Sequence, residues 1–254
     1  MGRRLGWLSV LAVLLALGTV SAAVAGEPEE GFAAIFNGKD LKDWDGNTDF
    51  WSVQDGIIHG ETTKEKPTKG NTFCIWRGLK DNPTWADGKL EDFELRLSFR
   101  IQGGNSGVQY RSKDLGNWVV GGYQAEVCNS PAVGFLYGER MRGSLADVGK
   151  KTILELGPDG KLVRKVVETF ADPKEAYANY KPKDWNDYRI VGQGNHLMQF
   201  INGKQTMDCT DNDEKGRVFS GILALQIHAG APMIVEFKDI RLKKLPKEAE
   251  KPKE

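Results

Sequence analysis

The sequence has few cysteines, few histidines and no excess of charge of either sign. Its 254 residues include three Cys and three His, and 35 Lys and Arg balance 35 Asp and Glu. A nucleic-acid-binding domain normally carries a basic excess or a basic stripe, so we expect no nucleic-acid partner. The cysteines form no C-x-x-C pair. They therefore argue against a structural zinc site and allow at most one disulfide.

The familiar catalytic and cofactor-binding motifs are also missing. The chain contains no G-x-S-x-G, no H-E-x-x-H, no Walker loop and no complete G-x-G-x-x-G. We therefore expect no cofactor, and any chemistry has to come from side chains spread over the fold. The acidic segment Asp208–Glu214 could hold a hard cation such as Ca²⁺. It lacks the EF-hand spacing, so we interpret it as a solvated loop and assign no metal ligands.

An uncharged apolar run occupies residues 5–20. It follows Arg3 and Arg4 and precedes an A-x-A sequence that ends at Ala25. This order is that of a secretory signal. We predict cleavage after Ala25 and a secreted or periplasmic protein with no membrane span after cleavage. An uncleaved membrane anchor is the alternative, and it is less favoured because the run is short and ends in small residues.

Strand patterns dominate the rest of the chain. Phe93–Arg100 alternates apolar and polar residues, which is the period of a strand with one buried face. Asn-Gly and Asp-Gly pairs mark turns, and only Asp172–Tyr180 resembles a helical turn, with Asp172 as its N-cap. We predict one all-β domain over residues 31–246, followed by a charged disordered tail at 247–254. Its length favours a jelly-roll β-sandwich of two antiparallel sheets over an immunoglobulin-sized sandwich. Further strands are predicted at residues 51–53, 57–60, 152–156, 188–191, 196–201, 221–228 and 233–237.

Three predicted strand segments carry an unusual set of polar residues that alternate with apolar ones. These residues are Gln109, Arg111, Gln124, Glu126, Gln226 and His228. Within each strand the two polar residues share the face opposite the core, and neighbouring outer faces form one surface. For any single strand a solvated face is the simpler interpretation. Together, amide, acid and base groups in place of Lys, Thr and Ser favour a binding site.

These residue types suit a carbohydrate ligand. Sugar hydroxyls need paired donors and acceptors, and sugar ring faces need aromatic platforms. Asn105 and Gly107 precede the first of these strands, and the glycine would let backbone approach a ligand closely. His59 and His196 are interpreted as structural or exposed. The candidate platforms, each of which alone is more typical of a core residue, are Trp44, Trp51, Trp76 and Trp118.

Several motifs occur in an order that is characteristic as a set. They are Gly31-Phe-x-x-Ile-Phe-Asn-Gly38, Gly104-Asn-Ser-Gly-Val-x-Tyr-Arg111, Tyr123-Gln-Ala-Glu126, Asp184-Trp-Asn-x-Tyr-Arg-Ile190 and Gly221-Ile-Leu-x-Leu-Gln-x-His228. Over residues 31–246 the chain resembles the bacterial 3-keto-disaccharide hydrolase domain family. The resemblance implies a concanavalin A-like jelly roll that is exported and acts on glycosides whose sugar C3 has been oxidised to a ketone.

The resemblance also implies roles for residues at motif positions. Glu126 and His228 would be catalytic, and Asn105, Arg111 and Gln226 would bind a 3-keto-glycoside. A base would remove the proton at C2, the enolate would expel the group at C1, and water would then add. The sequence does not show whether Glu126 or His228 is the base.

Three further residues complete the predicted binding set. Gln109 and Gln124 belong to it because they lie on the same polar face. Arg140 belongs to it because segment 134–138, together with Arg140 and Arg142, is expected to form a lid or a subsite. Direct hydrolysis would need a second carboxylate at glycosidase spacing, and on this face we identify only Glu126.

Two non-catalytic functions compete with the enzyme. A lectin-like carbohydrate-binding module could use the same fold and the same polar face, since fold alone does not determine function. A cell-surface adhesion or structural sandwich is less favoured, because it needs no such polar face. Glu126 and His228 on one predicted face favour the enzyme, because a lectin needs no base.

Overall fold

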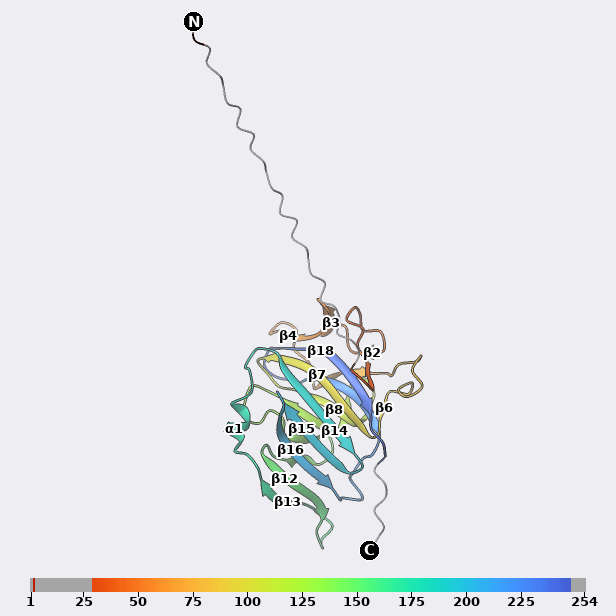
Figure 1. Cartoon of the computed structure of the whole chain (residues 1–254), viewed down its shortest axis with the longest axis vertical. Helices are drawn as coiled ribbons and strands as arrows, with labels where there is room; N and C mark the ends of the chain where they lie inside the picture. The colour runs from red at the N-terminus through yellow and green to blue at the C-terminus, as the bar shows by residue number, and fades with distance from the viewer. Residues whose placement is uncertain (1, 3–28, 248–254) are drawn as a thin grey trace.

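The computed structural model describes residue 2 and residues 29–247 (Figure 1). The predicted signal sequence, and all but the first residue of the predicted tail, lie outside the described residues. Within them, no helix is long and apolar enough to span a membrane. The three cysteines are buried free thiols.

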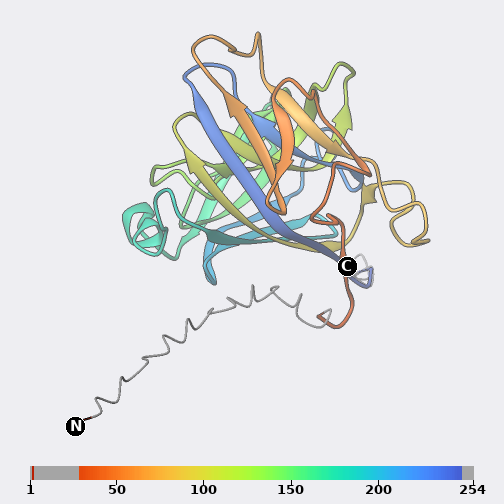
Figure 2. The same ribbon diagram turned by 90° about the horizontal axis from the view of Figure 1, so that it is seen from above.

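Two β-sheets enclose a common interior (Figure 2). Sheet A has the order β13 (Leu162–Thr169), β12 (Lys150–Leu156), β16 (Lys204–Asp211), β15 (His196–Ile201), β14 (Asn186–Gln193), β7 (Phe93–Gln102), β18 (Met233–Lys244), β4 (Ile57–Thr62) and β3 (Trp51–Gln54), with β1 (Phe32–Ala34) beside β18. Sheet B has the order β11 (Gly143–Ala146), β10 (Leu136–Glu139), β9 (Val120–Val127), β8 (Ser106–Asp114), β17 (Gly221–Ile227), β5 (Thr72–Trp76) and β2 (Trp44–Asp45), with β6 (Lys89–Leu90) beside β17. The strand pairs are antiparallel except for the parallel pair β12–β16. The predicted all-β sandwich is confirmed.

Period-two alternation explains the core between the sheets. On β7, Phe93, Leu95, Leu97 and Phe99 are all buried, as the sequence predicts. Burial of each such side chain contributes about 1.5–3 kcal/mol to folding. Sheet B supplies the opposing layer, including Tyr110, whose ring stacks on a neighbouring tyrosine with centroids 5.8 Å apart. The inner faces of both sheets therefore pack against each other and form the core.

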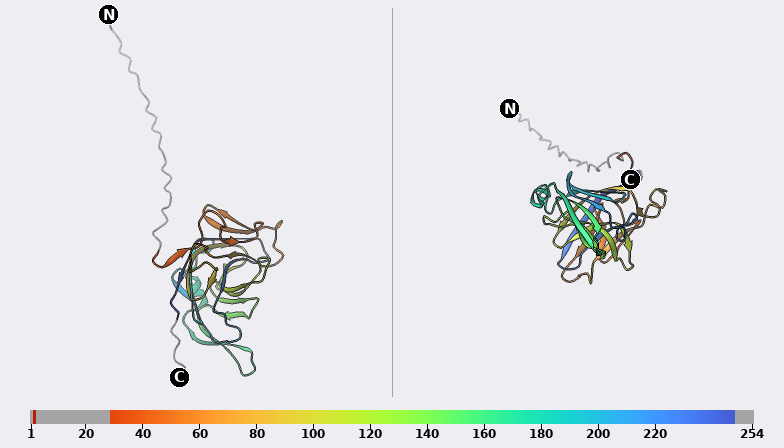
Figure 3. Two further views of the ribbon diagram at one scale, coloured as in Figure 1. Left: turned by 90° about the vertical axis from the view of Figure 1, so that its right-hand side faces the viewer. Right: turned by 90° about the horizontal axis from the view of Figure 1, so that it is seen from below.

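The predicted helical turn is also present. Helix α1 (Pro173–Tyr177) follows Asp172, whose side chain accepts a hydrogen bond from the backbone of Lys174, while Glu175 reaches back to the Asp172 backbone. This capping box satisfies backbone donors that a short helix would otherwise leave unpaired. In Figure 3 the hairpin of β12 and β13 extends away from the body of the sandwich.

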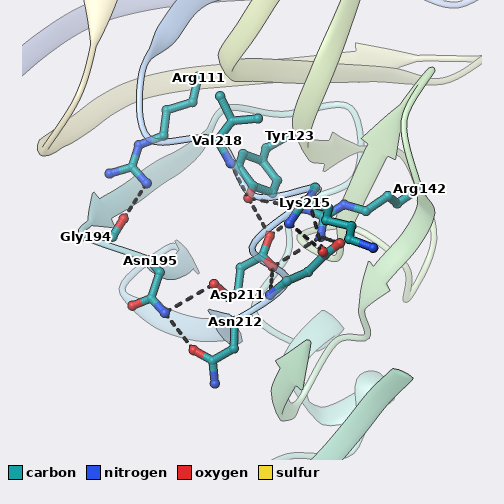
Figure 4. A network of polar contacts seen from close by, with 11 residues as sticks. Arg111, Tyr123, Arg142, Gly194, Asn195, Asp211, Asn212, Lys215 and Val218 are labelled. Atoms are coloured by element: carbon teal, nitrogen blue, oxygen red, sulfur yellow. Dashed lines mark hydrogen bonds and ion pairs between the residues drawn. The ribbon is translucent and has the colours of Figure 1, made fainter. Parts of the chain in front are cut away.

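The acidic segment at residues 208–214 is not a solvated loop. The Tyr123 hydroxyl donates to Asp211 Oδ2 at 2.5 Å, and Arg142 bonds both Asp211, at 2.5 Å, and Asp213, at 3.0 Å (Figure 4). Asp211 and Asp213 are both buried. Arg142 neutralises the two carboxylates, and its ion pairs hold the segment against sheet B.

The lid expected at residues 134–138 is not a lid. Leu136–Glu139 forms strand β10, which pairs with β9 on one side and β11 on the other. Arg142 lies beyond this strand and is held by the buried aspartates. The sequence pattern was misleading because glycines at both ends of a short segment also suit a mobile loop.

Candidate functional site

The candidate site lies on the outer face of sheet B. The residues that flank Glu126 in β9, Ala125 and Val127, point into the core, so Glu126 points to the other side. Glu126 lies opposite Gly107 of β8. Leu225 lies opposite Val108, which places the next residue of β17, Gln226, beside Gly107. Glu126 and Gln226 therefore face the same space from two strands that flank a glycine.

A chain of amide groups holds Glu126. Gln109 Nε2 donates to Gln124 Oε1 at 2.6 Å, and Gln124 Nε2 donates to Glu126 Oε2 at 2.9 Å. The Ser112 hydroxyl, 2.9 Å from Gln109 Oε1, begins this chain. Asn105 Nδ2 donates to the other oxygen, Oε1. Both oxygens of Glu126 accept amide hydrogens, so its orientation is fixed.

Two predicted binding residues, Gln109 and Gln124, are therefore bonded to one another and, through Gln124, to Glu126. Gln109 and Gln124 are fully or almost fully buried, and their amides are used within this chain. Gly107 also differs from its expected use. A Cβ at this position would lie 2.4 Å from Cδ of Gln124, so the glycine makes room for the glutamine side chain.

The environment of Glu126 makes its carboxylate a stronger base than an exposed glutamate. Burial raises the pKa of its carboxyl group, although the hydrogen bonds from Asn105 and Gln124 oppose the shift. Two further charges act at longer range, since His228 lowers this pKa and the carboxylate of Glu139 raises it. A glutamate whose pKa is moved toward neutrality is suited to take up and return a proton.

Gln226 contributes a buried amide group to this face. Its side chain is fully buried, and within the described residues neither Nε2 nor Oε1 has a hydrogen-bond partner. A buried amide group left without partners costs about 1–3 kcal/mol. The amide offers a donor and an acceptor side by side, as a sugar carbonyl or hydroxyl requires.

His228 lies at the end of β17, next to Asn105. Its backbone N–H donates to the Asn105 carbonyl at 3.3 Å, and its ring Nδ1 is 2.6 Å from the Ala229 carbonyl oxygen. A carbonyl can only accept, so Nδ1 carries the hydrogen and Nε2 remains available. The ring is exposed. The structure thus brings Asn105, Glu126, Gln226 and His228 together.

The sequence analysis missed two residues of this cluster. Glu139, on β10, lies opposite Gly122 and so on the same face as Gln124 and Glu126. Its Oε1 accepts a hydrogen bond from Asn71 Nδ2 at 3.2 Å, and Asn71 Oδ1 accepts one from the Ala229 backbone at 3.0 Å. Three strands separate β10 from β5, which follows Asn71. The contact therefore shows that sheet B curls over its outer face.

The prediction that Arg111 lies on the outer face of sheet B is wrong. The pairing of β8 with β9 is irregular between Tyr110 and Lys113, and Arg111 has a φ of 46°. This bulge turns the side chain to the opposite face, where it donates to the Glu91 carbonyl at 2.8 Å and to the Gly194 carbonyl at 2.7 Å (Figure 4). Arg111 is buried against sheet A and does not join the Glu126 cluster.

The aromatic candidates separate into two groups. Trp44, Trp51 and Trp76 are buried in the core. Trp118 belongs to the segment that joins β8 to β9, and its carbonyl accepts from Phe73 of β5 at 3.0 Å. Because β17 lies between β8 and β5, this segment crosses the outer face of sheet B as a strap. Trp118 is therefore the one tryptophan of the four placed over the predicted face.

Arg140 follows Glu139 in the turn after β10, is exposed, and has a φ of 50°. Its Cβ lies next to Gly121, a neighbour of Gly122 that points to the other face of the sheet. No ion pair within residues 29–247 involves it. Its part in ligand binding stays a prediction.

Two cavities lie elsewhere. One of about 240 Å³ is lined by residues around Trp85 and Lys244, and one of about 230 Å³ by residues around Phe50, His59 and Lys66. Neither includes a residue of the Glu126 cluster. Over residues 29–247, no group of three or more His, Cys, Asp or Glu side chains is placed to hold a metal ion.

Comparison with known proteins gives the family. The sequence profile of the 3-keto-alpha-glucoside-1,2-lyase-like domain matches residues 31–243. The chain belongs to this family. No curated protein matches the chain. The family assignment is consistent with the sequence motifs, which span nearly the same residues.

Solved structures of similar fold include two candidate glycosyl hydrolases from Parabacteroides distasonis. One is 20% identical with a TM-score of 0.51, and the match covers 84% of this chain and 99% of that chain. The other is 17% identical with a TM-score of 0.52, and the match covers 85% and 95%. At these identities the likeness shows the fold alone.

Proposed function

We propose that this member of the 3-keto-alpha-glucoside-1,2-lyase-like family cleaves 3-keto-glycosides on the outer face of sheet B. One observation carries the proposal most directly: Glu126 is buried and fixed by amide donors through both oxygens, and across Gly107 lies the amide of Gln226, which has no partner among the described residues. A lectin-like site that only binds sugars would not require a buried base. A site that removes a proton next to a ketone does.

In the proposed reaction Glu126 removes the proton at C2 of the sugar. The electron pair of the C2–H bond moves toward the C3 carbonyl and forms an enolate. Gln226 Nε2 donates to the C3 oxygen, and His228 Nε2, which has a free lone pair, accepts from a sugar hydroxyl. Hydrogen bonds aimed at charge that appears only in the transition state are among the largest contributions to catalysis.

The enolate then expels the group at C1. The C3 carbonyl re-forms, a C1=C2 double bond remains, and the bond from C1 to the glycosidic oxygen breaks. Water adds to C1, and Glu126 returns its proton to C2. The net reaction consumes one water and releases a 3-keto-sugar and an alcohol, which is glycoside hydrolysis by elimination and hydration.

The environment of each group supports this order of roles. Hydrogen bonds to both oxygens fix the orientation of the Glu126 carboxylate. Its raised pKa allows it to keep the proton from C2 until water has added to C1. His228 is exposed and keeps one ring nitrogen free, which suits contact with substrate oxygens or with water.

The test compares a 3-keto-disaccharide with its unoxidised parent disaccharide. We expect release of a free sugar from the keto form alone. Cleavage of both at similar rates would contradict the proposal and indicate an ordinary glycosidase. Binding of either without any cleavage would support the lectin-like alternative.

We also propose that the protein is exported, because residues 1–25 have the order of charged, apolar and small residues of a secretory signal. Mass spectrometry of the protein made in a bacterial host should find a chain that begins at Gly26 outside the cytoplasm. A full-length chain retained in the cytoplasm would contradict this.

A further inference from the structure

Glu139 is a second buried carboxylate on the face that carries Glu126. Its side chain is only 8% exposed. Its register opposite Gly122 places it four residues from Glu126 along the strands, or about 13 Å between backbone positions. Both side chains lie on the outer face of sheet B.

Nothing in the described part of the chain neutralises Glu139. No Lys, Arg or His nitrogen there lies within 4.0 Å of its carboxylate. Its only side-chain hydrogen-bond partner among these residues is Asn71, which donates to Oε1. Burial of a carboxyl group without a charged partner is costly, and a fold that keeps such a group tends to use it for function.

The two glutamates have different surroundings. Glu126 accepts amide hydrogens through both oxygens, which fixes it as an acceptor. Glu139 accepts through Oε1 alone, so Oε2 is available to carry a proton. Two carboxyl groups held in unlike environments is the arrangement by which sites separate a base from an acid.

We propose that Glu139 is the acid that protonates the departing glycosidic oxygen, and that Asn71 positions its carboxyl group. This inference rests on the proposed function. When the C1–O bond breaks, its electron pair goes to the glycosidic oxygen, which takes the proton from Oε2 of Glu139. When water adds to C1, the water gives its spare proton to the Glu139 carboxylate. Glu126 and Glu139 both return to their starting states.

Asn71 gives this acid a link to the other side of the site. Its amide bonds Glu139 through Nδ2 and the backbone of Ala229 through Oδ1, and the Ala229 carbonyl accepts from His228. Glu139 and His228 are thus joined through Asn71 and the backbone of Ala229, which holds the acid at a fixed place relative to His228.

The experiment uses 3-keto-glucosides that differ only in their leaving group. 4-Nitrophenolate departs without protonation, whereas the second sugar of a 3-keto-disaccharide needs an acid. We expect Glu139→Gln to lower kcat/KM for the disaccharide about 10²–10⁴-fold, and for the nitrophenyl substrate by less than about tenfold. Glu126→Gln should lower both alike, because C2 deprotonation precedes departure of either group.

Two further variants serve as a control and as a second test of the role of Glu139. Glu236→Gln changes a glutamate of equal burial on the opposite sheet and should leave the ratio of the two rates unchanged. Asn71→Ala should lower kcat for the disaccharide more than for the nitrophenyl substrate, even if Glu139→Gln does not fold.

Equal losses on both substrates, or no loss on either, would overturn the role of Glu139. Failure of the proposed function has a different signature, since the wild-type protein would then cleave neither 3-keto substrate.

Discussion

Buried glutamates on the outer faces of the two sheets have different hydrogen-bond partners. On sheet A, Glu94 bonds Arg96 and Arg189, and Glu236 bonds Arg100 and faces His59. On sheet B, Glu126 and Glu139 are buried to a similar degree, yet only amide groups donate to them. Glu94, Glu139 and Glu236 even share the same exposed fraction of 8%, so burial by itself does not distinguish a structural acid from a functional one.

The pKa values follow the same division. Burial alone would raise the pKa of Glu94, but Arg189 and Arg96 outweigh it and hold that pKa below its ordinary value. On Glu126 burial prevails and the pKa is raised. On sheet A the ion pairs of the glutamates stabilise the fold. On sheet B the two glutamates are buried without a cationic partner, which lowers the stability of the fold. Sites where a fold accepts such a cost are where function is expected.

The largest effect on activity should come from replacing one glutamate of each sheet by glutamine, in two separate variants. Glu126→Gln removes the proposed base, and we expect kcat/KM on a 3-keto-disaccharide to fall about 10²–10⁴-fold. Glu94→Gln should keep activity near that of the wild type while lowering the free energy of unfolding, because it leaves two arginines without their partner. Loss of activity in the Glu94 variant alone would remove the distinction between the faces.

A smaller effect is expected from Gln226. Gln226→Met keeps the volume of the side chain and removes a buried amide that has no partner, so stability should be unchanged or higher by about 1 kcal/mol. Activity should fall at least about tenfold, equivalent to about 1.4 kcal/mol, because the C3 oxygen loses its donor. Thermal unfolding and steady-state rates on one preparation measure both. A marked loss of stability would mean that Gln226 has a structural partner.

The smallest effect concerns folding stability. The contributions of Glu126 and Glu94 to the free energy of unfolding should change with pH in opposite directions. Because the folded state raises the pKa of Glu126, unfolding releases a proton in the window above the ordinary carboxyl pKa, and this residue makes stability fall as the pH rises through that window. For Glu94 the pKa is lowered, so its contribution is complete above the ordinary pKa and is lost as the pH falls through the lowered one.

Thermal unfolding between about pH 3 and pH 8 reads both signs. The Tm difference between Glu126→Gln and the wild type should shift in favour of the variant as the pH rises, by about 2–4 °C for each kcal/mol. The deficit of Glu94→Gln should shrink at acid pH. Parallel trends for the two variants would contradict the comparison.

Much of this arrangement can be predicted from sequence where alternation is unbroken. The strand at residues 93–100, the capped turn at Asp172 and the outward placement of Gln124 and Glu126 all follow from local pattern. Arg111 does not, because a bulge reverses its side, and a bulge leaves no mark in a period-two pattern.

Glu139 and Asn71 could not be found for a different reason. Glu139 lies in a short strand with glycine on either side, which also suits a loop. Asn71 lies just outside a strand and reaches the cluster only because sheet B is curled. Curvature depends on the whole sheet, so no local pattern could place these two side chains beside Glu126.

A crystal structure of the Glu126→Gln variant with a bound 3-keto-disaccharide tests the central claim most directly. We predict that the sugar lies on the outer face of sheet B, with C2 within about 3.5 Å of the residue 126 side chain, the C3 oxygen on Gln226 and the glycosidic oxygen facing Glu139. A sugar bound instead on sheet A, in the cavity lined by Phe50, His59 and Lys66, would contradict the claim.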